Sequence, residues 1–252
     1  MPLLTEIGSV RAILNRDPIW SVYMLGDLAP GMFEHCTWHA TADHQSLVAL
    51  FRGYGFPILF SENGVVGLLD EFDEPNLFLH IRTGDVQMLA TRYNVTQLRP
   101  MWRLALNHRK WSPAAVEGAR RLVKQDLEPL QQLYADGNTT GTSPDFFYPE
   151  MLESGVFYGQ WEGNELVAAA GTHLVNEAEG IACVGNVYTR ADRRRRGLAA
   201  RLTSAVTFRL LAKGIPFIAM NVDQAKPAAR RVYEKLGYRH HCDFWEGPAV
   251  RL

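Results

Sequence analysis

Residues 185–200 read Gly-Asn-Val-Tyr-Thr-Arg-Ala-Asp-Arg-Arg-Arg-Arg-Gly-Leu-Ala-Ala, and this stretch decides the fold of the C-terminal half. It starts at the end of an apolar, β-rich run, passes through a basic turn and opens a helical pattern. In that pattern Leu198, Leu202, Val206 and Leu210 recur every four residues, as on the buried face of an amphipathic helix. The stretch therefore predicts a strand, a turn and a helix in succession.

The turn between this strand and this helix has the composition of an anion site. A helix N-terminus presents N–H groups without intrahelical partners and a partial positive charge, which together favour phosphate. Gly197 and Ala199 leave room for an anion to approach the backbone, and the arginines beside them supply charge-assisted donors. Four consecutive arginines are commonly a solvated charged segment. Here they connect a strand to a well-formed helix, so we predict a phosphate or pyrophosphate site.

The sequence on either side predicts alternating helices and strands. Residues 126–134 and 150–153 predict helices, 156–161, 166–175 and 181–189 predict strands, and 216–222, 227–236 and 238–245 predict a strand, a helix and a last strand. Strands joined through the long helix should be parallel with a right-handed connection. The fold class is therefore mixed α/β, with a mostly antiparallel sheet and helices on both faces. A Rossmann site fits less well, because no GxGxxG motif is present.

These segments resemble the GNAT superfamily of N-acetyltransferases. Arg194-x-x-Gly197-x-Ala199 matches the acetyl-CoA signature of that family. A second match lies downstream, where Met220-Asn-Val-Asp223 is followed by Ala229-Arg-Arg-Val-Tyr233-Glu-Lys-Leu-Gly-Tyr238. The resemblance extends from Ala119 to the C-terminus. It implies a GNAT-type sheet, acetyl-CoA as the cofactor, and transfer of the acyl group to an amine acceptor by direct attack in a ternary complex.

The resemblance also implies roles for individual residues. The end of the strand predicted at 181–189 would pair its backbone with the pantetheine arm, and the start of the following helix would hold the pyrophosphate. The cofactor-binding set implied in this way is Val187, Tyr188, Thr189, Arg194, Arg195, Arg196, Gly197, Leu198, Ala199, Ala200, Asn221 and Lys226. Lys226 stands where family members commonly carry Asn. Tyr233 would protonate the departing thiolate, and the alternative for Tyr233 is a core aromatic beside Val232 and Leu236.

The general base is left open by the sequence. Residues 181–186 carry no Glu or Asp that could accept a proton from the amine. Glu179, Glu150 and Asp145 lie on predicted loops or helix ends, and a water held by Asn186 is a further alternative. Without an evident base, a non-catalytic CoA-binding or ligand-sensing module is the alternative to an enzyme.

The first half predicts a smaller α/β domain without a CoA site, over residues 1–110. Helices are expected at 3–15 and 18–28, and strands at 37–40, 47–52, 57–60, 77–81 and 101–106. This order resembles a shortened, degenerate version of the C-terminal plan, although identity between the halves is too faint to establish a repeat. Residues 107–118 are polar and contain Pro and Gly, so we predict the boundary there, with the catalytic domain at 117–252.

Composition excludes several classes of protein. Lys and Arg number 26 against 27 for Asp and Glu, so no global field favours nucleic acid. No apolar run reaches the roughly 18 residues of a membrane span, and the start does not resemble a signal peptide, so we expect a cytoplasmic protein. Cys36, Cys183 and Cys242 have no metal-ligand spacing, which predicts reduced thiols and no metal site. A monomer or homodimer is expected, and the identity of the amine stays open.

Overall fold

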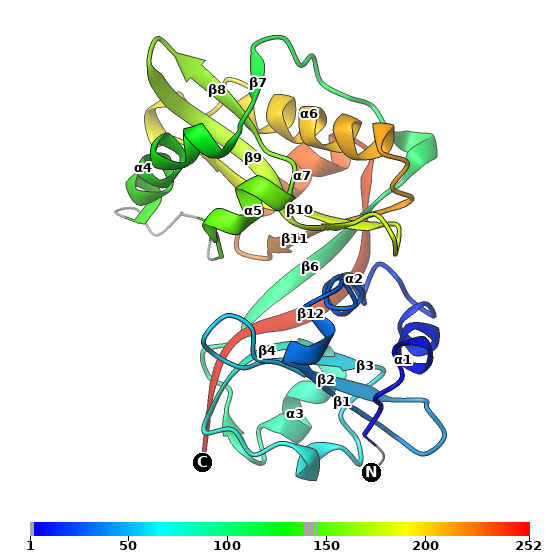
Figure 1. The fold of residues 1–252 in the computed structure, drawn as a ribbon. Helices are drawn as coiled ribbons and strands as arrows, with labels where there is room; N and C mark the ends of the chain where they lie inside the picture. Colours follow the sequence, from blue (N-terminus) through cyan, green and yellow to red (C-terminus); the bar gives the residue numbers. More distant parts are fainter. Residues whose placement is uncertain (1–2, 139–143, 145) are drawn as a thin grey trace. The chain divides into compact units, whose positions relative to one another are not determined.

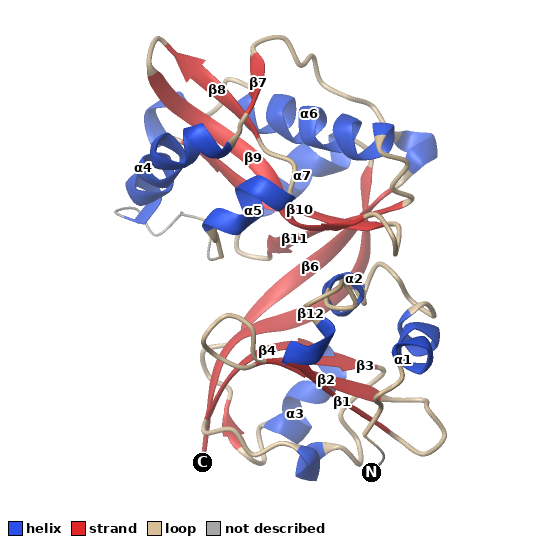
Figure 2. Ribbon diagram, in the orientation of Figure 1, coloured by secondary structure: helices blue, strands red, loops and turns tan. Residues whose placement is uncertain are grey.

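The computed structural model describes residues 3–138, 144 and 146–252 (Figure 1). Its helices and strands, in chain order, are α1 (Ile7–Leu14), α2 (Val22–Gly26), β1 (Cys36–Ala40), β2 (Leu47–Phe51), β3 (Ile58–Glu62), β4 (Asn76–Arg82), α3 (Val86–Leu89), β5 (Tyr93–Asn94), β6 (Arg99–Leu106), β7 (Ala119–Arg121), α4 (Leu127–Asn138), α5 (Pro149–Ser154), β8 (Tyr158–Glu162), β9 (Glu165–Asn176), β10 (Ile181–Thr189), α6 (Leu198–Ala212), β11 (Phe217–Asp223), α7 (Pro227–Lys235) and β12 (Tyr238–Arg251). Helices and strands mix along the whole chain (Figure 2), which confirms the α/β class.

Contacts divide the chain into two compact units, and neither is one continuous segment. Unit 1 consists of Met1–Arg103, Val222–Lys226 and His240–Leu252, and unit 2 of Leu104–Asn221 and Pro227–Arg239. The end of the chain groups with unit 1 because β12 pairs antiparallel with β4, in the same unit. This grouping differs from a linear division at residues 107–118. The limits of independently folding domains stay a prediction.

Unit 2 is built on strands in the order β11-β10-β9-β8-β7. β7 to β10 pair antiparallel, whereas β10 and β11 are parallel and joined through α6, as the sequence predicts. Leu198, Leu202, Val206 and Leu210 are all buried, because this face of α6 packs on β8, β9 and β10. α4 and α5 pack against β9, in a core that includes Leu130 and Leu152 from the helices and Phe157 and Tyr188 from the sheet region.

Unit 1 has strands in the order β1-β2-β3-β4-β12, with β5 paired to β12. β1, β2 and β3 pair antiparallel, and β3 is parallel to β4. Its core includes Leu50, Leu59, Leu79 and Ile81 from these strands. Each unit therefore contains a run of antiparallel strands, β7 to β10 in unit 2 and β1 to β3 in unit 1, followed by one parallel strand, and the resemblance between the halves is confirmed at the level of the fold. The connection differs, because β3 and β4 are joined by a loop with a 3-10 turn at Leu69–Glu71 rather than by a long helix.

Two strands of the C-terminal half differ from the prediction. β12 continues to Arg251 instead of ending near Trp245, although Gly247-Pro248 is a strand-breaking pair in sequence. Gly247 and Pro248 both have register partners on β4, and this strand pairing outweighs their local preference for a turn. β7 was not predicted, because three residues, Ala119–Arg121, are too few to show a period in the sequence.

Candidate active site

An opening between β10 and β11 forms the centre of the candidate site in unit 2. The two strands pair only from Ile181 with Phe217 to Val184 with Met220. Gly185 is the first β10 residue beyond this pairing, and Asn221 comes after Met220 on β11. Within the described chain, 185–189 have no register partner on β11, so this backbone edge can accept an extended ligand as an added strand would.

A β-bulge in β10 lies at the start of this opening. Gly185 is opposite Gly171 and Tyr188 is opposite Ala169, so β10 contains one more residue than β9 over this interval. Asn186, inside the bulge, has left-handed backbone with φ of 52° and is 3% exposed. The Tyr134 hydroxyl donates to the Asn186 carbonyl at 2.8 Å, which fixes the bulge against α4.

A second bulge faces the first from β9. Thr172 is opposite Val184 and Leu174 is opposite Cys183, so His173 is the extra residue. A Cβ on Gly185 would lie 2.1 Å from the His173 ring, which shows that the imidazole covers Gly185.

The paired glycines identify the face of the sheet on which the imidazole lies. A Cβ on Gly171 would lie 2.2 Å from the Phe157 ring, and Gly171 is the register partner of Gly185. Paired residues project to the same face, so His173 and Phe157 both lie on the face covered by α4 and α5. The sequence analysis missed His173, and the available signal was this pair of strand glycines beside a histidine.

The start of α6 follows the open edge of β10 along the chain. Gly197 is the N-cap residue with φ of 77°, and a Cβ there would meet nothing within 4 Å. The first backbone bond of the helix runs from the Arg201 N–H to the Gly197 carbonyl at 3.0 Å. The N–H groups of Leu198, Ala199 and Ala200 precede that bond and have no intrahelical acceptor. They form the anion-binding end that the sequence predicts.

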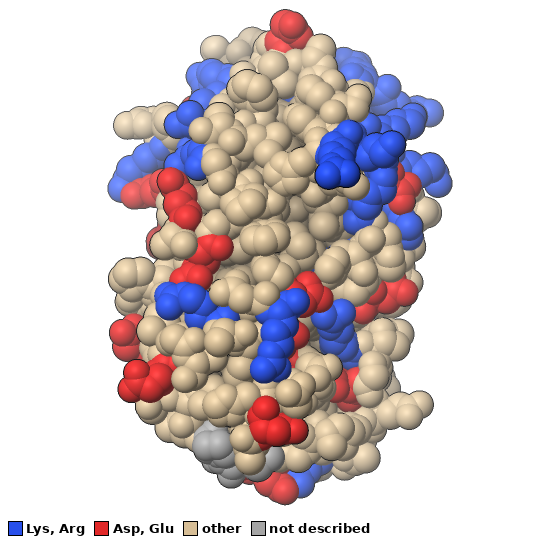
Figure 3. All heavy atoms as spheres, turned by 90° about the vertical axis from the view of Figure 1, so that its right-hand side faces the viewer, with Lys and Arg blue, Asp and Glu red and all other residues tan. Residues whose placement is uncertain are grey.

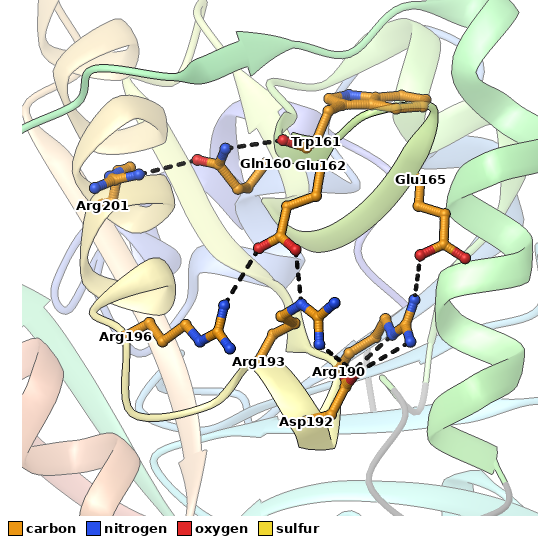
Figure 4. A network of polar contacts seen from close by, with 9 residues as sticks. All are labelled: Gln160, Trp161, Glu162, Glu165, Arg190, Asp192, Arg193, Arg196 and Arg201. Atoms are coloured by element: carbon orange, nitrogen blue, oxygen red, sulfur yellow. Dashed lines mark hydrogen bonds and ion pairs between the residues drawn. The ribbon is translucent and has the colours of Figure 1, made fainter.

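Most of the arginines around this turn are paired with acidic side chains (Figure 4). Arg193 Nε donates to Glu162 at 2.8 Å, Arg196 lies 3.5 Å from the same carboxylate, and Arg190 binds Glu165 at 2.8 Å. The hydrogen bond from Arg193 to Glu162 raises the pKa of Arg193. Because these ion pairs are exposed, they add little stability and mainly fix the shape of the turn.

Arg194 and Arg195 are placed differently. Arg194 Nε donates to the Thr189 carbonyl at 3.1 Å, and its guanidinium lies 5.9 Å from the centre of the Tyr188 ring. Arg195 is exposed, has left-handed backbone with φ of 63°, and binds no acidic side chain in the part of the chain that the structure describes. Of the run, Arg195 is therefore the arginine with its charge available to a phosphate.

The Tyr188 side chain belongs to the core rather than to the opening. It is 3% exposed, and its hydroxyl donates to Asp136 at 2.8 Å. Only the backbone of Tyr188 can therefore take part in binding on the β11 side.

Tyr233 lies on α7 and is 7% exposed. Burial raises its pKa to about 12, so the phenol is neutral at physiological pH and can donate a proton. Its hydroxyl has no hydrogen-bond partner among the described residues. The ring packs edge-on to Tyr238 with 6.5 Å between centres, and Tyr238 is within electrostatic reach of Cys183 on β10. Tyr233 is thus a packing residue whose neutral hydroxyl has a proton to donate.

The remaining predicted positions are not all brought together. Lys226 is exposed and groups with unit 1, whereas the rest of the predicted set is in unit 2. Glu150 is exposed at the start of α5, and Glu179, in the turn before β10, lies six residues before Gly185, roughly 20 Å along an extended strand. Asp145 lies outside the described residues. No cluster of three or more potential metal ligands occurs in the described chain.

Charge on the surface is mixed. Figure 3 shows one face on which basic side chains gather most densely at the upper right, with acidic side chains among and below them. Over residues 3–138, 144 and 146–252, no helix has the length and apolarity needed to cross a membrane.

The sequence of unit 2 matches a known family. Residues 125–238 match the profile of the Acetyltransferase (GNAT) family. No curated protein matches the chain by sequence.

Solved structures share the fold over nearly the whole chain. A GNAT-family protein from Novosphingobium aromaticivorans aligns with a TM-score of 0.64 and 20% identity, covering 93% of this chain and 97% of its own. A Drosophila protein aligns with a TM-score of 0.70 and 14% identity, covering 99% and 97%. A tandem GNAT protein from the clavulanic acid biosynthesis pathway aligns with a TM-score of 0.55 and 12% identity, covering 97% and 94%. At these identities the likeness concerns the fold alone.

Proposed function

We propose that the chain is an N-acyltransferase that transfers the acetyl group of acetyl-CoA to a primary amine, from the premise that residues 125–238 match the GNAT acetyltransferase family. One observation carries the proposal. The unpaired edge of β10 from Gly185 to Thr189 leads directly to the start of α6, where free N–H groups and Arg195 surround open space at Gly197. This arrangement fits an elongated ligand that ends in phosphates.

The chain offers separate contacts for the parts of acetyl-CoA. The backbone of Val187 to Thr189 would hydrogen-bond the amides of the pantetheine arm. The N–H groups of Leu198, Ala199 and Ala200 would bind the pyrophosphate, with Arg195 adding a charge-assisted bond. Asn221, across the opening from Gly185, would contact the pantetheine or acyl portion.

The reaction in this proposal is a direct transfer within a ternary complex. The amine nitrogen attacks the thioester carbonyl carbon, and the carbon–sulfur bond breaks. Tyr233 supplies a proton to the departing thiolate, which its neutral phenol permits at physiological pH. The backbone around the Asn186 bulge orients the thioester, so much of the rate gain comes from positioning.

Lys226 has a separate place in the proposal. Its ammonium is exposed and would contact a phosphate of the cofactor.

Steady-state release of CoA tests the enzyme against a non-catalytic CoA-binding module. The full chain is incubated with acetyl-CoA and butylamine, benzylamine or glycine, and both free thiol and the amide product are measured. Equal amounts of thiol and amide support the transferase. Binding of acetyl-CoA without amide formation from any of these amines supports the binding module.

A further inference from the structure

His173 is placed at the centre of the proposed site by the two facing bulges. It is the extra residue of β9, opposite the interval in which β10 also carries an extra residue. Bulges re-aim a side chain and are over-represented beside active sites. Here the bulge turns the imidazole over Gly185, where a Cβ would lie 2.1 Å from the ring carbon Cδ2 and from Nε2.

Gly185 marks the position at which β10 and β11 stop pairing. A thioester held along the free edge of β10 would reach this point with its carbonyl carbon, if its phosphates lie at α6. The imidazole therefore belongs to β9, the strand beside β10, and covers Gly185, the residue at which the opening begins. It is half-buried, so it is shielded from bulk water but not sealed in the core.

We infer that His173 is the general base of the proposed acyl transfer, and the inference rests on that proposed function. An imidazole nitrogen takes one proton from the ammonium group of the acceptor. The nitrogen lone pair then forms the bond to the carbonyl carbon, the carbon–sulfur bond breaks, and the thiolate takes a proton from Tyr233. The nitrogen, positively charged after the attack, gives up its second proton, and this proton returns through water to the Tyr233 phenolate. The imidazolium releases its proton to solvent, so no further reactant is required.

Imidazole suits this role chemically, because an unperturbed histidine titrates near ~6.5, close to physiological pH. The sequence offered carboxylates and a water held by Asn186 as candidates. Of the carboxylates, Glu179 lies roughly 20 Å along the strand from Gly185 and Glu150 is exposed. Other titratable groups of the elements that pack on this face are Glu128, Tyr134 and Asp136 on α4, Tyr148 before α5, Glu153 on α5, and Cys183 and Tyr188 on β10.

The test compares pH profiles of kcat/KM for the full chain with acetyl-CoA and the most reactive of butylamine, benzylamine and glycine. We expect the wild-type value to rise with pH and to level off once the imidazole is deprotonated. In H173Q the pH profile should lose this inflection and kcat/KM should fall by roughly 10²- to 10⁴-fold, with acetyl-CoA affinity unchanged. The kcat/KM of G185A should fall as well, because the new Cβ displaces the His173 ring.

His173→Ala provides a second readout, rescue by added imidazole. If His173 is the base, imidazole should raise the rate of this variant at least tenfold, whereas it would not rescue the loss of a purely structural side chain. E179Q is the comparator and should keep the wild-type profile. An H173Q variant with the wild-type inflection, or an E179Q variant that loses it, overturns the inference. Failure of the wild type to acetylate any of the three amines contradicts the proposed function itself, so the two failures are distinguishable.

Discussion

Asn63 of unit 1 and Asn186 of unit 2 occupy equivalent positions. Each lies five residues after the first residue of its strand that pairs in parallel, Ile58 in β3 and Ile181 in β10, and both have left-handed backbone, with φ of 57° and 52°. The chain takes a different course after each asparagine. After Asn186 the strand continues to Thr189 and the arginine turn, whereas after Asn63 the chain turns through Gly64 into a loop.

We predict that the first half of the chain, residues 1–110, makes no contact with acetyl-CoA. Trp20 Nε1 donates to the Ser61 carbonyl at 2.8 Å, on the strand edge that would have to bind a pantetheine arm. Arg82, the counterpart of Asn221, pairs with Asp17 at 2.8 Å and lies 4.4 Å from the Trp20 ring. Hydrogen–deuterium exchange with acetyl-CoA should show protection of residues 185–200 and none of 58–66. Protection confined to 58–66 would contradict this assignment.

The sequence predicted the strand–turn–helix of unit 2 because each step has a local cause. The four leucine and valine positions of α6 give a clear helical period, and Gly197 marks its start. The bulges were not predictable, because an extra residue in a strand is defined by its partner strand and not by its own sequence. For the same reason the bases that the sequence offered were carboxylates on loops and a water held by Asn186, and His173 on the neighbouring strand was not predicted.

The arginine run shows a second limit of sequence. The pattern made Arg194, Arg195 and Arg196 equivalent, but the structure separates them. Glu162, more than thirty residues earlier, pairs with Arg196, and the Thr189 carbonyl binds Arg194. Only the folded hairpin of β8 and β9 brings Glu162 to the turn.

Arg195→Ala should raise the Kd for acetyl-CoA by about tenfold, because a charge-assisted bond to phosphate contributes roughly 1.5–3 kcal/mol before screening. Arg193→Ala is the matched control. Its guanidinium is already bound to Glu162, so its loss should change Kd by less than about threefold. Calorimetry at two salt concentrations measures both. Equal effects of the two variants would show that Arg195 has no special contact.

Tyr233→Phe should lower kcat by roughly one to three orders of magnitude, in line with the loss of a general acid. A free thiol titrates near ~8.5, so the thiolate can leave without protonation and activity should not vanish. Phenylalanine keeps the ring that packs against Tyr238. The Kd for acetyl-CoA and the melting temperature should be unchanged. Wild-type kcat in this variant would make Tyr233 a packing residue only.

Glu62→Gln should change how stability depends on pH. Burial raises the pKa of Glu62 from 4.5 to about 7, and the Ser21 hydroxyl donates to its carboxylate at 2.9 Å. Between these two pH values the native state holds a proton that the unfolded state has lost, so the free energy of unfolding falls as pH rises.

The glutamine variant cannot titrate and should lose this dependence. Relative to wild type it should gain about 1–3 kcal/mol in the free energy of unfolding between pH 5 and pH 8. Urea unfolding at the two pH values measures the difference. An identical pH dependence in both proteins would mean that Glu62 is ionised in the native state.

The central claim, that the turn before α6 binds the phosphates of acetyl-CoA, is tested most directly by calorimetric titration of Gly197→Glu. The new carboxylate would stand in the open space at the helix start and repel the pyrophosphate, so we predict that Kd rises more than about 100-fold. Gly197→Ala is the control for backbone strain at φ of 77° and should weaken binding by less than about tenfold. Unchanged acetyl-CoA affinity in the folded Gly197→Glu variant would contradict the site.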